Sequence, residues 1–129
     1  MRTVIILLTV FILTLPSMGW AFEVDRKVVR IEDGDTFEFE SLDPAVAPTH
    51  RCSMLGYDAP EGSVWNGGRW VKSPDPKAAG AANMLRKLIL GKVVRIRGER
   101  TGTDDRWRCE VWLKDGTSVN RAMKAYLGQ

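Results

Sequence analysis

Hydrophobic and polar side chains alternate in several short stretches of the chain, as they do in strands with one buried face. The clearest stretch is "KVVRIEDGDTFEFESL" (residues 27–42), where Phe37 and Phe39 alternate with glutamates. Asp33-Gly34 within it is a strong turn signal, so the stretch predicts the two strands of a hairpin. Three further strands are predicted at "RCSMLGY" (51–57), "KVVRIRGE" (92–99) and "DDRWRCEVWL" (104–113).

One long segment carries helix signals instead. "KAAGAANMLRKLIL" (77–90) is rich in helix-forming residues and follows Pro76, a residue favoured in the first turn of a helix. Ser73 or Asp75 is the expected N-cap, and Gly91 is the expected C-cap. The segment therefore predicts a helix that starts and stops sharply.

The predicted order of elements is three strands, a helix, two strands and a short C-terminal helix at "SVNRAMKAYLG" (118–128). Between the third strand and the first helix, "EGSVWNGGRWVKSPDP" (61–76) is expected to be a long loop. The order favours a mainly β fold with helices (α+β): a five-stranded Greek-key barrel of the oligonucleotide/oligosaccharide-binding (OB) type, with a helix between strands 3 and 4. A generic α+β sandwich is the alternative.

The N-terminal residues have the pattern of a secretory signal peptide. Arg2 precedes an apolar run from Val4 to Leu15, and Gly19 and Ala21 are the small residues that a signal peptidase reads. We expect residues 1–21 to be removed and residues 22–129 to form one domain. The protein is then exported, to the periplasm or outside the cell, without stable membrane association and as a monomer. The alternative is an uncleaved N-terminal anchor.

Charge is unevenly distributed over this domain. Residues 22–61 carry ten acidic and four basic side chains, whereas residues 62–129 carry fourteen basic and six acidic ones. Such a division can pair a cation-binding acidic edge with a polyanion-binding basic surface, or the two halves can neutralise each other in the fold. His50 is the single histidine, which removes most histidine-dependent triads and metal sites.

Three acidic residues follow turns or strand ends. Asp35 comes after the Asp33-Gly34 turn, and Asp58 and Glu61 follow the third strand. Two carboxylates side by side repel each other, and a divalent cation removes that cost; a third carboxylate can take a proton from water. The residues alone leave open whether these acids form a metal and base site or are simply solvated.

The motifs "DGDT" (33–36) and "GYDAPE" (56–61), in this order and with an Ala-rich helix and "GKVVRIR" (91–97) after them, resemble the staphylococcal nuclease (thermonuclease-like) family. The similarity extends over nearly all of residues 24–129. It implies an OB barrel and Ca²⁺-dependent hydrolysis of phosphodiester bonds in DNA and RNA, single-stranded or denatured nucleic acid being the expected partner.

Carried over residue by residue, the resemblance implies a calcium site. Asp35 and Asp58 would be side-chain ligands of Ca²⁺, and the carbonyl of Ala59 would be a third protein ligand. Glu61 matches the glutamate that orients or deprotonates the attacking water. The cation would hold a phosphate oxygen and neutralise developing charge.

The arginines depart from the family pattern. The family's first arginine falls on Ser53, and Arg51, on the same face of the strand, is the candidate replacement. Arg106 is in register with the family's second arginine, with Arg108 as the alternative. These departures keep a second function open, a catalytically weak or inactive OB module that binds single-stranded nucleic acid or another polyanion. A third is a domain that binds a protein partner.

Cys52 and Cys109, the only two cysteines, are expected to point inward from neighbouring strands of such a barrel. We therefore predict a buried Cys52–Cys109 disulfide, with two free thiols as the alternative. Trp65, Arg69 and Trp70 lie in the expected loop after Glu61. The tryptophans either anchor this loop to the barrel or, beside a basic residue, stack on bases of a single strand.

Overall fold

The computed structural model describes residues 20–100 and 107–129. Their elements, in chain order, are β1 (Trp20–Asp33), β2 (Thr36–Glu40), β3 (Thr49–Met54), β4 (Ser63–Trp65), β5 (Trp70–Lys72), α1 (Pro76–Ile89), β6 (Val93–Arg100), β7 (Trp107–Trp112) and α2 (Val119–Tyr126).

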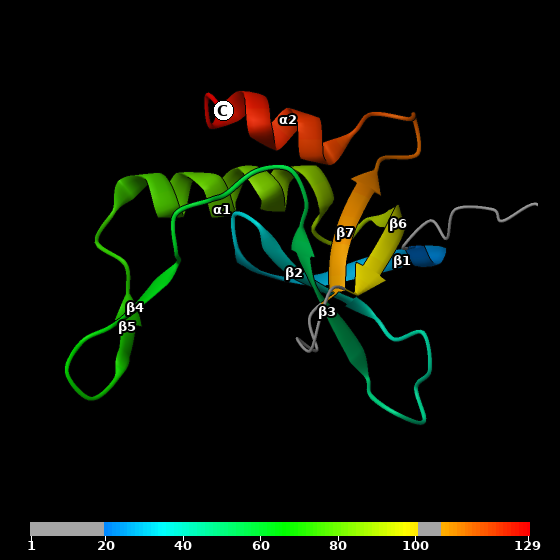
Figure 1. The fold of residues 1–129 in the computed structure, drawn as a ribbon, viewed down its shortest axis with the longest axis horizontal. Coiled ribbons are helices and arrows are strands. Elements are labelled where there is room, and N and C mark those ends of the chain that lie inside the picture. Colours follow the sequence, from blue (N-terminus) through cyan, green and yellow to red (C-terminus); the bar gives the residue numbers. More distant parts are fainter. Residues whose placement is uncertain (1–19, 101–106) are drawn as a thin grey trace, which may run out of the picture.

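Five of the strands form a closed barrel in the order β1-β2-β3-β7-β6 (Figure 1). β3 and β7 are parallel, and the other neighbouring pairs are antiparallel. α1 lies between the third and fourth barrel strands in the sequence, and α2 follows the fifth. The predicted OB-type barrel with two helices is therefore confirmed.

The first strand closes the barrel because it serves two neighbours. Residues 20–27 of β1 pair with β6, and residues 28–33 pair with β2. The strand thus begins earlier than predicted, two residues before the expected signal-peptide cleavage site. Phe22 and Val24 alternate with Glu23 and Asp25 directly after the expected cleavage site, a strand signal that the prediction did not use. Residues 1–19, which carry most of that prediction, lie outside the described part of the chain.

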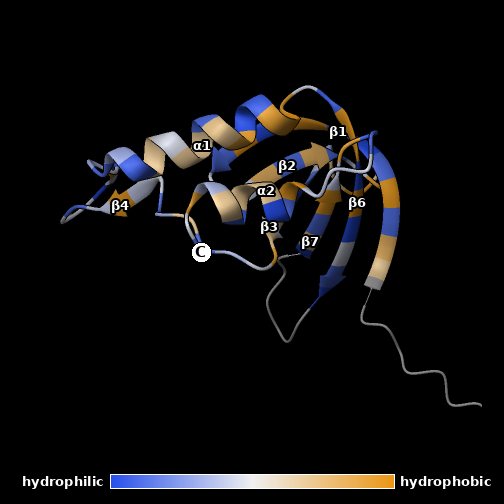
Figure 2. Cartoon of the chain, turned by 90° about the horizontal axis from the view of Figure 1, so that it is seen from above, coloured by the Kyte–Doolittle hydropathy of each residue, from blue (hydrophilic) through white to orange (hydrophobic). Residues whose placement is uncertain are grey.

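The alternation in β2 sets the core. Phe37 and Phe39 are fully buried, their rings 6.0 Å apart, while Glu40 is exposed. Both helices carry mixed hydrophobic and hydrophilic residues (Figure 2), as expected for helices with one face on the barrel. α1 buries Leu85 and Ile89, and α2 buries Met123. In the part of the chain that the structure describes, no helix is long and apolar enough to cross a membrane.

The N-cap predicted for the long helix is confirmed, and its C-cap is Leu90, one residue before the predicted Gly91. Asp75 is the N-cap of α1 and accepts a hydrogen bond from the Lys77 amide at 2.9 Å, with Pro76 in the first turn. Gly91 follows the last turn with φ +75°, a left-handed conformation that favours glycine. The N-cap fixes where α1 starts, and hence the length of the segment between β3 and α1.

The segment 61–76 differs from its prediction as a simple loop. β4 and β5 form a separate two-stranded hairpin, which projects beyond the N-terminal end of α1, away from β1 and β6 (Figures 1 and 2). Asn66 donates its amide to the Arg69 carbonyl at 2.9 Å across the turn. Strand-forming residues on either side of "NGGR" were the sequence signal for this hairpin. Each of these two stretches was too short to outweigh the loop signal of the surrounding Gly, Pro and Ser residues.

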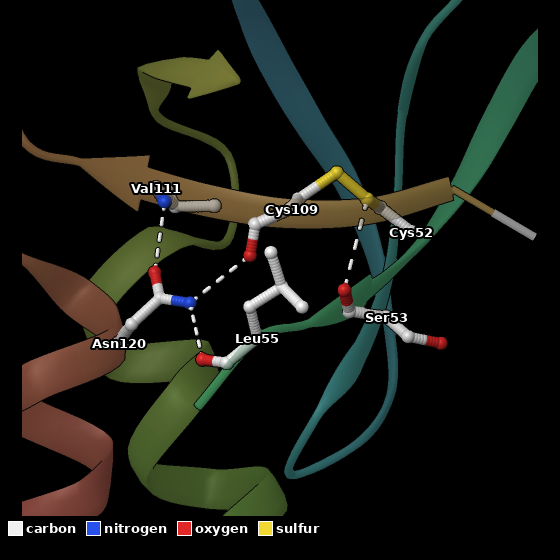
Figure 3. Close-up of a disulfide and its surroundings, with 6 residues drawn as sticks. All are labelled: Cys52, Ser53, Leu55, Cys109, Val111 and Asn120. Carbon is white, nitrogen blue, oxygen red and sulfur yellow. Dashed lines mark hydrogen bonds between the residues drawn. A yellow bond between two sulfur atoms is a disulfide. The ribbon is translucent and has the colours of Figure 1, made fainter. Parts of the chain in front are cut away.

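Two sets of contacts bind β3, β7 and α2 together (Figure 3). Cys52 of β3 and Cys109 of β7 are fully buried and are joined as a disulfide, with their Cα atoms 6.0 Å apart. The Asn120 side chain accepts from the Val111 amide at 2.8 Å and donates to the Leu55 carbonyl at 2.8 Å. The predicted cysteine pairing agrees with this arrangement.

Loss of the disulfide should destabilise the barrel. The double variant Cys52→Ala/Cys109→Ala should lose about 2–4 kcal/mol of unfolding free energy, because the unfolded chain gains conformational freedom. Urea unfolding with and without reductant measures this: reductant should lower the midpoint of the wild type and leave that of the double variant unchanged. Two titratable thiols in denatured, unreduced protein would contradict the bond.

Candidate active site

A pocket of about 660 Å³ opens at the end of the barrel where β3 stops. Its wall combines four carboxylates, two guanidiniums and two indole rings. The residues that supply them are Asp33, Asp35, Asp58, Glu61, Arg51, Arg108, Trp65 and Trp70. Asp35, Asp58 and Glu61, which the sequence motifs single out, thus lie around one space.

The turn between β1 and β2 holds the first of these carboxylates in place. Gly34 and Asp35 form the turn itself, so Asp35 precedes β2 instead of beginning it. The Tyr57 hydroxyl donates to the Gly34 carbonyl at 2.7 Å, and the Met54 amide donates to the Asp35 carbonyl at 2.7 Å. A Cβ atom on Gly34 would lie 2.5 Å from the Cβ of Ala81 in α1, so only glycine allows this approach.

The Asp35 carboxylate is half-buried and hydrogen-bonded on both oxygens. Oδ2 accepts from the Ala59 amide at 3.2 Å, and Oδ1 accepts from the Thr36 hydroxyl at 3.2 Å. Burial, and then the neighbouring Asp33, raise the pKa of Asp35 from 3.8 to about 7. Burial and the same carboxylates also raise the pKa of Tyr57, which therefore remains a neutral donor.

The segment after β3 carries the other two predicted acids. Asp58 is exposed, and the Gln129 side chain holds its backbone from both sides: Oε1 accepts from the Asp58 amide at 3.0 Å, and Nε2 donates to the Asp58 carbonyl at 2.6 Å. Ala59 is buried and is not among the described residues that line the pocket, although its amide donates to Asp35. Glu61 is exposed on the pocket wall.

The guanidiniums come from β3 and β7. Arg51 lines the pocket, and its Nη2 atom forms a 2.6 Å ion pair with Glu32 Oε2 on β1. Arg108 lines the same pocket from the parallel strand, in register with Ser53. Arg106, the favoured second arginine, lies outside the described residues. The alternative, Arg108, is thus the β7 arginine seen at the pocket.

The donor set suits a hard cation. The described residues that line the pocket offer carboxylate oxygens and include no histidine or cysteine, which fits Ca²⁺ or Mg²⁺. The raised pKa of Asp35 marks an ionised form that a nearby positive charge would stabilise. Among residues 20–100 and 107–129, no group of three or more acidic, histidine or cysteine side chains is close enough to hold a metal by itself. A cation here would therefore draw on Asp35, Asp58 and water, with the Ala59 carbonyl as the further ligand that the resemblance implies.

Several contributors were not predicted from the sequence. The Asp33 carboxylate accepts a hydrogen bond from the Asp35 amide at 3.1 Å. The sequence "DGD" suggests this bond, since an aspartate side chain often accepts from the amide of the second residue after it. Gln129 had no sequence signal. Trp65 and Trp70 are 60% and 68% exposed, so the interpretation that they anchor a loop to the barrel is wrong. They line the pocket instead.

Removal of the Asp35 charge should stabilise the protein above neutral pH. Since the folded-state pKa is raised, folding favours protonated Asp35, and stability falls as pH rises from about 3.8 through about 7. Asp35→Asn should therefore raise Tm at pH 8 in chelator, and the gain should vanish near pH 4. Ca²⁺ should raise Tm of the wild type and raise that of Asp35→Asn less. Glu40→Gln, which removes an exposed carboxylate of β2, is the control and should change neither result.

Gln129 should protect the Asp58 amide. Gln129→Ala removes the acceptor and should speed hydrogen exchange at this amide about 5- to 10-fold, as expected for one hydrogen bond of about 1 kcal/mol. Gln129→Glu keeps an acceptor and should preserve most of the protection. NMR-detected exchange measures both, and equal exchange rates in the wild type and Gln129→Ala would refute the clamp.

No protein-family model matches the chain, and no match is found among curated proteins. The resemblance to the staphylococcal nuclease family therefore depends on the sequence motifs described above.

Proposed function

We propose that the protein is an exported nuclease that hydrolyses phosphodiester bonds of DNA or RNA with the help of Ca²⁺. The observation that supports this most is the convergence of Asp35, Asp58 and Glu61 with Arg108 on one pocket. Their order in the sequence, which resembles the thermonuclease-like pattern, gives each a role. The predicted export rests on the N-terminal sequence alone.

Glu61 is the general base in this proposal. It is exposed on the pocket wall, free to face a water molecule, and transfer of a proton from that water produces the nucleophile. Asp35 and Asp58 would hold the cation, and the resemblance adds the Ala59 carbonyl as a third protein ligand. When bound, the cation supplies positive charge that offsets the charge building on the phosphate oxygens.

Arg108 is the principal phosphate clamp. A guanidinium can donate two parallel hydrogen bonds to a phosphate, which orients the phosphate and stabilises its transition state. Arg51 is a weaker second clamp because it is already paired with Glu32, so it must share or exchange that partner when a phosphate enters. Arg106 was the first choice from the sequence and remains a further candidate.

A binding module without catalysis is the second function. Ser53 at the position of the family's first arginine, and the Arg51–Glu32 pair, favour it, since both reduce the number of guanidiniums available to a transition state. Such a module would bind single-stranded nucleic acid in a salt-dependent manner and cleave nothing. A protein-binding domain would show neither property.

Glu61→Gln should abolish most of the activity. With denatured DNA and Ca²⁺, we expect a rate 10²- to 10⁴-fold below that of the wild type, the range for loss of a general base. Chelator should stop the wild type as well. Glu40→Gln is the matched control and should cleave normally. Absence of cleavage by folded wild type with Ca²⁺, Mg²⁺ or Mn²⁺ would replace the nuclease by the binding module.

Arg108→Ala should lower the rate of cleavage about 10²- to 10³-fold, as for removal of one transition-state donor. Arg121→Ala, which removes an exposed arginine of α2, is the matched control. Arg106→Ala is measured in parallel. Of Arg106 and Arg108, the arginine whose loss lowers the cleavage rate more is the phosphate clamp. An unchanged rate in Arg108→Ala would remove Arg108 from the mechanism.

A further inference from the structure

The β4–β5 hairpin exposes two large aromatic side chains beside the carboxylate pocket. Trp65 and Trp70 are cross-strand partners, and they are 60% and 68% exposed. β4 and β5 pair with each other and with no other described strand. Exposed indole rings forgo a large gain from burial, so their presentation on a projecting hairpin indicates a surface for a ligand.

The two rings do not cover each other. Their centroids are 5.6 Å apart, and their planes stand at 70°, so the edge of one indole meets the face of the other. This arrangement stabilises the pair. It also prevents the rings from enclosing a flat ligand between them, because that needs parallel faces. Since both rings are mostly exposed, each can stack separately on a ligand.

The chemistry around the rings favours a nucleotide base as the occupant. Trp65 and Trp70 line the same pocket as Arg108 and Arg51, which suit a phosphate, so one nucleotide can meet both kinds of group. Arg69 adds a positive charge next to Trp70 at the tip of the hairpin. An anionic membrane surface is disfavoured because the pocket's carboxylates would face it. A neutral sugar would offer no negative charge to Arg108.

We propose that the β4–β5 hairpin is a base-binding subsite, in which Trp65 and Trp70 stack on unpaired bases next to the phosphate held in the pocket. The inference rests on the proposed action on nucleic acid, and it adds a determinant of substrate choice. Bases in a duplex are stacked and paired inside the helix, so they cannot lie on these rings without being unpaired. The subsite therefore selects single-stranded or locally unpaired substrates.

Binding to three labelled probes tests the subsite: single-stranded octathymidylate, an abasic strand of the same length, and a duplex hairpin. The abasic strand keeps the phosphates and sugars and lacks the bases. Fluorescence anisotropy in the Glu61→Gln background with Ca²⁺ gives each Kd without cleavage. Trp65→Ala or Trp70→Ala should weaken binding of the octathymidylate about 5- to 150-fold, the range for one aromatic stacking partner.

The same substitutions should leave the affinity for the abasic strand unchanged, and Trp65→Phe should retain most of the binding. Val46→Ala, at another exposed hydrophobic residue, is the matched control and should have no effect. Equal weakening for base-bearing and abasic strands, or no weakening, would overturn the subsite. So would Trp-dependent binding to phosphatidylserine vesicles with no effect on the oligonucleotide.

Failure of the subsite and failure of the nuclease are distinguishable. Trp-dependent binding of unpaired bases without any cleavage keeps the subsite and rejects the nuclease. Cleavage that depends on Glu61, with equal rates on single-stranded DNA in the wild type, Trp65→Ala and Trp70→Ala, keeps the nuclease and rejects the subsite.

Discussion

The contact between the Gly34–Asp35 turn and the segment after β3 is the constraint on which the candidate site depends. The Tyr57 hydroxyl and the Ala59 amide donate to the turn, and Ala81 of α1 lies too close for any side chain at Gly34. These contacts carry Asp35 to the neighbourhood of Asp58 and Glu61. A larger residue at Gly34 would push the turn from the helix, and the carboxylates would separate although each remained on its own element.

The barrel was predictable because its strands and caps are local signals. Phe37 and Phe39 show strand alternation, and Asp75, Pro76 and Gly91 mark the limits of α1. The pairing of Cys52 with Cys109 followed from neighbouring strands in that barrel. The β4–β5 hairpin was not predicted, since runs of three residues give too few positions for alternation to be recognised.

The site was predictable only as far as its motifs reach. "DGDT" and "GYDAPE" identified Asp35, Asp58 and Glu61, and the structure brings all three to one pocket. The Gln129 clamp on Asp58 could not be read from the sequence, because it joins residues 71 positions apart through one side chain. The exposure of Trp65 and Trp70 could not be predicted from the sequence either, since tryptophans in a loop more often anchor that loop to the core. Their placement depends on how far the hairpin projects.

In the proposed nuclease, the charge of the pocket would couple cation binding to substrate binding. Four carboxylates and two guanidiniums line it, so it carries a formal excess of two negative charges when all are ionised. Such an excess would repel a phosphodiester; the pKa of Asp35 is raised first by burial and then by the neighbouring Asp33. A divalent cation held by these carboxylates would bring the formal charge to zero, and in the proposed nuclease Arg108 could then act on the phosphate. By linkage, phosphate must then strengthen cation binding as much as the cation strengthens phosphate binding. A polyanion bound without a cation would have to avoid this pocket and use the basic residues elsewhere on the barrel.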